Sequence, residues 1–146
     1  GLISTFAAVS LNSGREKARD SRRLSDMKQL QTAMEFLYDD NDTYVMADTN
    51  CDPTGFTIPV EVSTCDVDLT TYLPNLAQLN DPDDALDICP ATLSTPATAD
   101  LGCNYSFKTA PTLTGYAVSF YLEAASSIGN TGPQLCTLTE DGITCP

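Results

Sequence analysis

Histidine is absent from this chain of 146 residues. Because histidine is the side chain whose ordinary pKa suits proton transfer near neutral pH, its absence excludes Ser-His-Asp and Cys-His nucleophilic sites. The sequence also has no CxxC pair, no CxxCH haem-attachment motif and no glycine-rich phosphate-binding motif. Carboxylates could still act in pairs as acid and base, but in so acidic a chain their spacing singles none out. We therefore expect no enzymatic activity and no bound cofactor.

Basic residues are scarce after the first third of the chain. Residues 1–44 hold six of the seven lysines and arginines against seven acids, a net charge of −1. Residues 45–146, called the head from here on, hold only Lys108 against thirteen acids, a net charge of −12. A surface of this sign repels phosphate backbones. Direct binding of nucleic acid is therefore not expected.

The sequence also lacks an apolar run long enough to cross a bilayer. The segment from Gly1 to Leu11 is apolar apart from small hydroxyl residues, but a membrane-spanning helix needs about 20 such residues. It has no basic flank and no signal-peptide cleavage pattern. We interpret residue 1 as a boundary inside a longer apolar helix. The alternative is a frayed N-terminal tail.

Cysteine, by contrast, is present six times. An even number of cysteines without any histidine to complete a zinc site favours disulfides and an oxidising compartment. Short loops and even spacing favour local pairing, although six cysteines permit fifteen connectivities. The predicted pairs are Cys51–Cys65, Cys89–Cys103 and Cys136–Cys145.

A long helix is predicted at the N-terminal end. Ser13 to Tyr38 contains no proline and consists mostly of strong helix formers. If Leu2 to Asp40 is one helix, its length is about 58 Å, which is too long for the head to cover. One face is apolar and should pack on the head, at Leu24, Met27, Leu30, Met34 and Leu37. The other side is predicted to face solvent or a neighbouring subunit, and it carries Arg15, Arg19, Arg22 and Arg23. Asn41 is expected to end the helix in the left-handed conformation.

The head is expected to be loop-rich at first and β-structured later. Thr43 to Pro111 has frequent turn residues, with one short helix predicted around Leu69 to Leu79. Alternating apolar residues then predict strands at Asn104–Thr109, Tyr116–Leu122, Gln134–Thr139 and Gly142–Cys145. These strands should form a small antiparallel sheet of about three to four strands that packs on the helix. The predicted fold class is α+β, with a helix over residues 1–44 and a globular acidic head over residues 45–146.

Residues 1–44 resemble the N-terminal helix of type IV pilins and type II secretion pseudopilins. The match runs through Gly14-Arg-Glu-Lys-Ala-Arg19, Ser25-Asp-Met-Lys-Gln-Leu30, Ala33-Met34-Glu35 and Asp40-Asn41-Asp-Thr-Tyr44. A second, looser similarity to the family's "YLP … DP … YxY" succession runs through Tyr72-Leu-Pro74, Asp81-Pro82 and Asn104-Tyr105-Ser-Phe107. In that family the helix begins with an apolar stretch carrying an N-methylated aromatic and a glutamate, which would precede Gly1.

The resemblance implies a pilin-like fold and a structural role. The loop between Asp81 and Cys103 and the cysteine pattern depart from secretion pseudopilins, so the favoured reading is the major subunit of an extracellular type IV pilus-like filament. Residues 1–13 would form the apolar filament core and residues 14–44 the part packed on the head. Before assembly the subunit would be anchored in the inner membrane and handled by the pilus assembly machinery. The alternatives are a major pseudopilin, or a minor tip pilin acting in adhesion or uptake.

An exposed apolar helix end on a soluble head is an association surface in its own right. Copies of the chain that bury such ends against one another, without closing a ring, form a helical homopolymer. The residues expected to act in filament assembly are Leu2, Ile3, Phe6, Val9, Leu11, Arg15, Arg19, Arg22 and Arg23. The arginines would pair with acids of neighbouring heads, in a salt-sensitive contact.

Two further kinds of site have weak signals. Carboxylates at Asp81, Asp83, Asp84 and Asp87 could supply oxygen ligands for calcium, and the pseudopilin resemblance implies such a site, but the EF-hand spacing is absent. Aspartates around proline are more often turn residues. Asn41 and Asn104 begin N-x-S/T glycosylation motifs, which arise often by chance.

Overall fold

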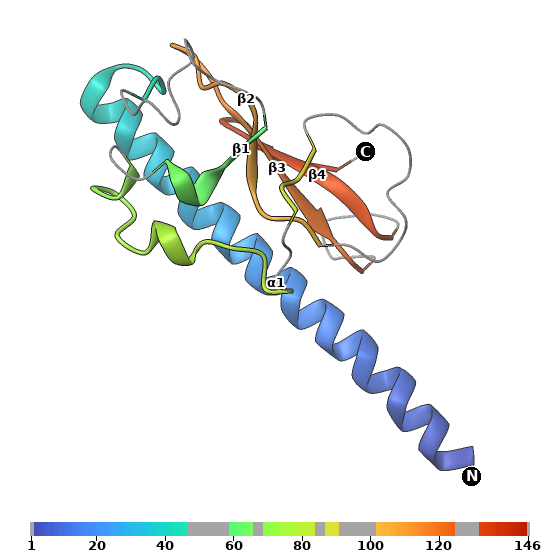
Figure 1. The fold of residues 1–146 in the computed structure, drawn as a ribbon. Helices are drawn as coiled ribbons and strands as arrows, with labels where there is room; N and C mark the ends of the chain where they lie inside the picture. The colour runs from blue at the N-terminus through green and yellow to red at the C-terminus, as the bar shows by residue number, and fades with distance from the viewer. Residues whose placement is uncertain are drawn as a thin grey trace.

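The structure is a computed structural model that describes residues 2–46, 59–65, 69–83, 87–90, 102–124 and 132–145, with side chains from residue 11 onward. A single long helix leads into a head that contains an antiparallel sheet (Figure 1). The α+β class predicted from the sequence is confirmed.

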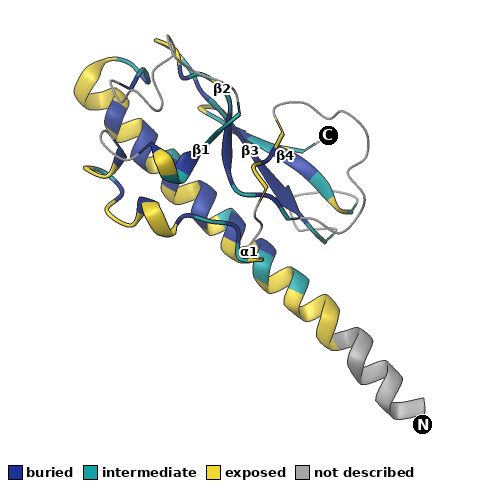
Figure 2. Cartoon of the chain, viewed as in Figure 1, coloured by how far each residue is buried: buried dark blue, intermediate teal, exposed yellow. Residues whose placement is uncertain are grey.

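Helix α1 spans Leu2–Asn41, 40 residues, and at about 1.5 Å per residue it is about 60 Å long. Its C-terminal half lies against the head, whereas its N-terminal half extends away from it (Figure 1). Figure 2 shows the change in burial along the helix, from exposed side chains at residues 11–15 to a buried stripe that begins at Asp20. The stripe contains the predicted Met27, Leu30, Met34 and Leu37, while Leu24 is only partly buried.

The helix ends one residue later than expected. Asn41 is still helical, and it is Asp42 that adopts the left-handed conformation, with φ of 55°. The amide of Asp42 donates to the carbonyl of Tyr38 at 2.8 Å, the bond that closes a left-handed helix stop. The side chain of Asn41 donates instead to the carbonyl of Leu37 at 2.9 Å. The prediction that Asn41 is the stop residue is therefore wrong by one position.

The described residues form a five-stranded antiparallel sheet in which the strand order follows the chain order. The strands are β1 Val60–Glu61, β2 Ser106–Thr109, β3 Ala117–Leu122, β4 Gln134–Thr139 and β5 Gly142–Thr144. The four predicted strands are found within two residues of their expected bounds. The predicted count of about three to four strands is corrected to five, because the two residues of β1 are too few to show alternation.

Helix α1 packs on β3 and β4, the two longest strands. Aromatic side chains strengthen the contact near the end of the helix, where the Tyr44 ring lies 4.7 Å from that of Tyr38 and 5.0 Å from that of Tyr116. Burial raises the pKa of Tyr44 to about 12, and a hydrogen bond to Glu35 adds to this effect. The core is therefore a helix face laid across a sheet.

The predicted helix around Leu69 to Leu79 is not continuous. Leu69 is helical, and residues 66–68 before it lie outside the described residues, but turns follow from residue 70 and the next regular element is the 3₁₀ helix η2, Leu76–Gln78. Pro74 has no amide proton and disfavours helical backbone in the residue before it, so a longer helix could not continue through this point. A second 3₁₀ helix, η1 at Val62–Thr64, follows β1.

Segment 69–83 runs back along α1 (Figure 1). Near one end the hydroxyl of Tyr72 donates to Asp40 at 2.7 Å, and near the other Asp81 bonds to Arg23. The helix is thus held by this segment on one side and by the sheet on another.

Two of the predicted disulfides are present, Cys89–Cys103 and Cys136–Cys145. Cys65 is also disulfide-bonded, and its predicted partner, Cys51, lies outside the described residues. Within the described part of the chain, no helix combines the length and the apolar character needed to cross a membrane.

Candidate functional site

The most unusual side chain in the described structure is Arg23, whose guanidinium is completely buried. Its Nε and Nη2 donate to the two carboxylate oxygens of Asp81, each at 2.7 Å. Its Nη1 donates to Asp20 at 2.8 Å and also to Glu123. Planar two-point pairing of this kind fixes the direction of both partners. The carboxylates come from the helix, from segment 69–83 and from the end of β3.

Arg19 lies one helical turn before Arg23 and reaches the same end of β3. Its Nε donates to Glu123 at 2.8 Å, and its Nη2 pairs with the second oxygen of that carboxylate. Asp20, which is 3% exposed, accepts the backbone amides of Glu123 at 3.0 Å and Ala124 at 2.9 Å. We call these five residues, Arg19, Asp20, Arg23, Asp81 and Glu123, the neck cluster, because they lie where α1 leaves the head.

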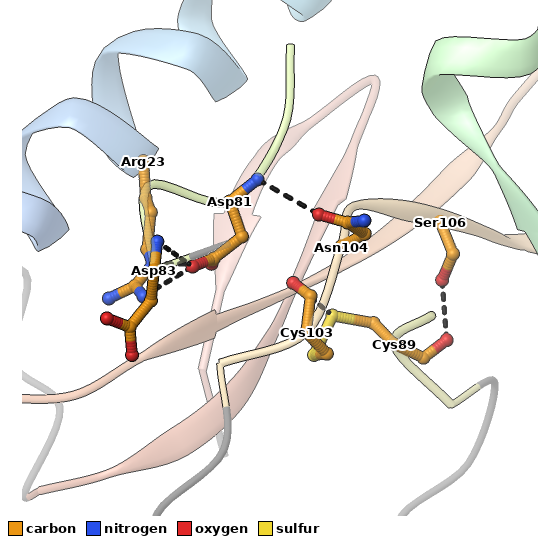
Figure 3. The surroundings of a disulfide bond; sticks show 7 residues. All are labelled: Arg23, Asp81, Asp83, Cys89, Cys103, Asn104 and Ser106. Carbon is orange, nitrogen blue, oxygen red and sulfur yellow. Dashed lines mark hydrogen bonds and ion pairs between the residues drawn. A yellow bond between two sulfur atoms is a disulfide. The ribbon is translucent and has the colours of Figure 1, made fainter. Parts of the chain in front are cut away.

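The surroundings of Asp81 place a disulfide beside the neck cluster (Figure 3). Asp81 accepts the amide of Asp83 at 2.9 Å, and its own amide donates to Asn104 at 3.2 Å. Gly102, next to the Cys89–Cys103 disulfide, lies against the same ion pair. A Cβ atom at this position would stand 2.9 Å from the Oδ1 atom of Asp81. The close approach requires a residue without a side chain.

The neck cluster joins two guanidinium groups to three carboxylates. Burial opposes the charged form of Glu123, but hydrogen bonds from Arg19 and Arg23 outweigh it and hold the pKa of this carboxyl below its ordinary value. Burial also opposes the charge of Arg23, and the bonds to Asp81 outweigh that effect, so the pKa of the guanidinium is raised. The hydrogen bond to Glu123 likewise raises the pKa of Arg19. Arg19, Arg23 and Glu123 are therefore charged at neutral pH.

A further buried carboxylate, Asp26, lies about one turn beyond Arg23 along the helix. Asp26 is 8% exposed and accepts a hydrogen bond from the hydroxyl of Tyr105 at 2.9 Å. Burial raises the pKa of Asp26, against the lowering effect of this bond. Tyr105 is fully buried, and its pKa is raised by burial and by the negative charge of Asp26. This pair extends the polar contact between α1 and the sheet into the apolar core.

The arginines predicted to face neighbouring subunits fall into two groups. Arg23 is buried and satisfied within its own chain, so its assignment to an outward surface is wrong. Arg19 is likewise directed to Glu123 and to Asp83, at 3.8 Å. Arg15 is exposed, and Arg22 is exposed with one weak contact to Asp26 at 3.9 Å. The physical reason is that the buried stripe of α1 continues from Met27 towards the N-terminus, where its residues, Arg23 and Asp20, are polar.

The apolar residues predicted for filament assembly lie in the projecting half of the helix. Leu11 is 62% exposed. Leu2, Ile3, Phe6 and Val9 belong to the helical backbone of α1, and their side chains lie outside the described residues.

The calcium candidates differ in their burial and in their partners. Asp81 is buried with both oxygens bonded to Arg23, whereas Asp83 and Asp87 are exposed, and Asp84 lies outside the described residues. Across the described ranges, no group of three or more acidic or cysteine side chains is placed to hold a metal ion. Asp81 therefore serves an ion pair, which corrects its assignment as a ligand candidate.

The two glycosylation candidates differ in exposure. Asn41 is exposed at the end of α1, with its amide nitrogen bonded to Leu37. Asn104 is half-buried, accepts from Asp81 and donates to Glu61 at 3.5 Å. Its side chain is part of the support of the neck cluster.

Sequence reasoning missed Asp20 and Glu123 as partners of the arginines. One signal was available for Asp20, which lies three residues before Arg23 and on the same face of a helix. No comparable signal exists for Glu123, because its partner is 100 residues away in the chain.

Comparison with known proteins adds no relative. No family model matches the chain, and neither a curated protein nor a solved structure matches it.

Proposed function

We propose that this protein is a structural subunit of an extracellular filament of the type IV pilus kind, assembled by side-by-side packing of α1. The observation that carries the proposal is the helix itself, which continues well beyond the head. The first described side chains of the projecting part, residues 11–15, are all exposed, and Leu11 among them is apolar. A helix that the head cannot cover needs another apolar surface.

The free energy gained by burying the apolar side chains of residues 2–11 favours association of the helices. Complete burial of a leucine or phenylalanine side chain is worth about 1.5–3 kcal/mol. Residues 2–11 contain Leu2, Ile3, Phe6, Val9 and Leu11, so parallel copies of α1 have ample apolar surface to bury against one another. A contact repeated head-to-tail along an axis produces an open helical array.

The neck cluster suits the same role. Contacts from two sides of the head hold α1 at Arg19, Asp20 and Arg23, where the helix begins to project. A helix fixed at this point keeps one direction relative to its head. Regular stacking of heads around a fibre requires such a fixed direction.

The proposal is tested with the full gene product expressed in a host that has a type IV assembly machinery. Filaments sheared from the cells are imaged by negative-stain electron microscopy, and their composition is measured by mass spectrometry. A major subunit should be the predominant protein of the fibres. A trace amount in fibres made of another protein would replace the proposal with a tip subunit, and absence from any fibre would reject it.

A further inference from the structure

The outward side of α1 is charged and largely unpartnered. Asp20, Arg23 and Met27 mark the side that faces the head. On the remaining surface four basic side chains are exposed, Arg15, Lys17, Arg22 and Lys28. Among the described residues these cations have one ion-pair partner, Asp26, at 3.9 Å from Arg22. The helix face is therefore open to an external negative group.

The exposed charges follow two lines along the helix. At about 100° per residue, positions 11 or 18 residues apart return to nearly the same direction. Lys17, Lys28 and Asp39 therefore share one flank of α1. Arg22 and Asp40 share another flank, with Arg15 seven residues before Arg22. All six side chains are exposed. Each flank is basic near the neck and acidic at the C-terminal end.

The acidic end has no compensating charge within the helix. Asp39 and Asp40 lie in the last turn of α1, which contains no basic residue. Carboxylates at a helix C-terminus are unfavourable by about 0.3–1 kcal/mol each, because the helix dipole is negative there. The hydroxyl of Tyr72 contacts Asp40 but is neutral. A cation from another molecule would relieve this repulsion.

We propose that the flank of α1 that carries Lys17, Lys28 and Asp39 docks the opposite end of the same flank of a second copy, shifted along the helix axis by about 33 Å, or 22 residues at about 1.5 Å each. This shift places Lys17 of one copy beside Asp39 of the next. The inference rests on the proposed function, since it assumes parallel helices. It adds the residues that set the stagger of this pair of copies, while the apolar segments 2–11, each only about 15 Å long, bury against neighbours at smaller shifts.

The charge balance supports a second copy of this chain as the occupant. The head has a net charge of −12 and the helical part supplies nearly all the cations. Arg19 and Arg23 are paired with carboxylates of their own chain. The four exposed cations are therefore the ones that can pair with a neighbouring copy. A chain of this composition presents both halves of the contact on one helix.

Zero-length crosslinking tests the stagger directly. Lys17 and Asp39 are about 33 Å apart within one helix, so a water-soluble carbodiimide cannot join them inside a chain. In purified filaments of the full chain, we expect a Lys17–Asp39 isopeptide in the tryptic digest. The crosslink should not form when the filaments are dispersed into subunits before the carbodiimide is added. Filaments in which Lys17 is joined only to other carboxylates would overturn the inference and leave the proposed function standing.

A charge swap provides an independent measurement. Lys17→Glu should raise the amount of subunit released from filaments at fixed salt by about tenfold, because like charges then face each other. Adding Asp39→Lys to the same chain should restore wild-type release. Lys108→Glu, which reverses the single cation of the head, is the matched control and should leave release unchanged. Release equal to wild type in Lys17→Glu would overturn the inference, whereas absence of wild-type fibres would overturn the proposed function itself.

Discussion

A guanidinium without solvent exposure needs fixed negative groups around it, and Arg23 finds them in three segments of the chain. Removing one partner of a buried ion pair is costly because the other charge is left without compensation. The neck cluster is therefore the place where single substitutions should have their largest effect on the junction between helix and head.

Arg23→Met is expected to lower the free energy of unfolding by about 3–5 kcal/mol, because Asp81 would remain buried without its partner. Urea denaturation followed by circular dichroism measures this change. Arg22→Met is the control, since Arg22 is 56% exposed, and it should change stability by no more than about 0.5 kcal/mol. A loss below about 1 kcal/mol for Arg23→Met would show that the head is held without the neck cluster.

The lowered pKa of Glu123 predicts that the free energy of unfolding depends on pH. Because the pKa of Glu123 is lower in the folded state, its contribution is fully present above the unfolded value of 4.5 and is lost as the pH falls through the folded value. Glu123→Gln should cost about 1–3 kcal/mol at pH 7. The difference from wild type should shrink towards acidic pH.

Urea denaturation of both proteins at a series of pH values below 7 measures that difference. Glu16→Gln, on α1 outside the neck cluster, is the matched control. A constant difference between Glu123→Gln and wild type at every pH would contradict the assignment. Asp26 titrates with the opposite sign in the wild type, because its raised pKa weakens the folded state as the pH rises, so only the difference between variants is diagnostic.

The burial of Arg23 could not be predicted from the sequence. Arginine is rarely buried completely, and in a helix carrying four arginines nothing distinguishes this one. Its position three residues before Asp26 and four before Met27 places it on the packed face, but the apolar pattern begins only at Leu24. The deciding information lies at Asp81 and Glu123, which are 58 and 100 residues further on.

At the scale of elements, the C-terminal end of α1 combines an unfavourable backbone conformation with unfavourable charges. Asp42 holds a left-handed conformation that glycine adopts more easily, in a region already crowded with carboxylates. The bond from its amide to Tyr38 needs only the backbone.

Asp42→Gly should therefore raise the free energy of unfolding by about 0.5–1 kcal/mol, because it relieves both backbone strain and repulsion with the helix dipole. Asp42→Asn removes the charge alone and should give a smaller gain. Thermal unfolding of the two variants beside wild type measures the effect. A lower stability of Asp42→Gly would mean that the aspartate side chain has a supporting contact of its own.

Elements with a strong period were among those predicted correctly. Alternation over six residues identified β3 and β4, and the three- and four-residue spacing identified the packed half of α1. The two residues of β1 carry no period, and its existence depends on pairing with β2. A short helix was predicted around Leu69 to Leu79, but Leu73, Leu76 and Leu79 contribute to the core from irregular backbone and the 3₁₀ helix η2 instead.

On the scale of the whole molecule, protection of α1 should depend on assembly. In a dispersed subunit the amides of residues 11–18 should exchange with solvent quickly, because the head does not cover this part of the helix. Residues 27–37, packed on the sheet, should exchange slowly. In filaments both parts should be protected, and hydrogen exchange with mass spectrometry of the two states measures the change. Unchanged exchange at residues 11–18 on assembly would place the fibre contact elsewhere.

The distances along the chain between members of the neck cluster have a consequence for the order of events during synthesis. Arg23 leaves the ribosome long before Asp81 and Glu123, which follow 58 and 100 residues later. From β2 to β5, each described strand pairs with the next strand in sequence, so these hairpins can form as they emerge. The Arg23 guanidinium must therefore stay hydrated until Glu123 has been synthesised. The contacts of the neck cluster then form among the last steps of folding.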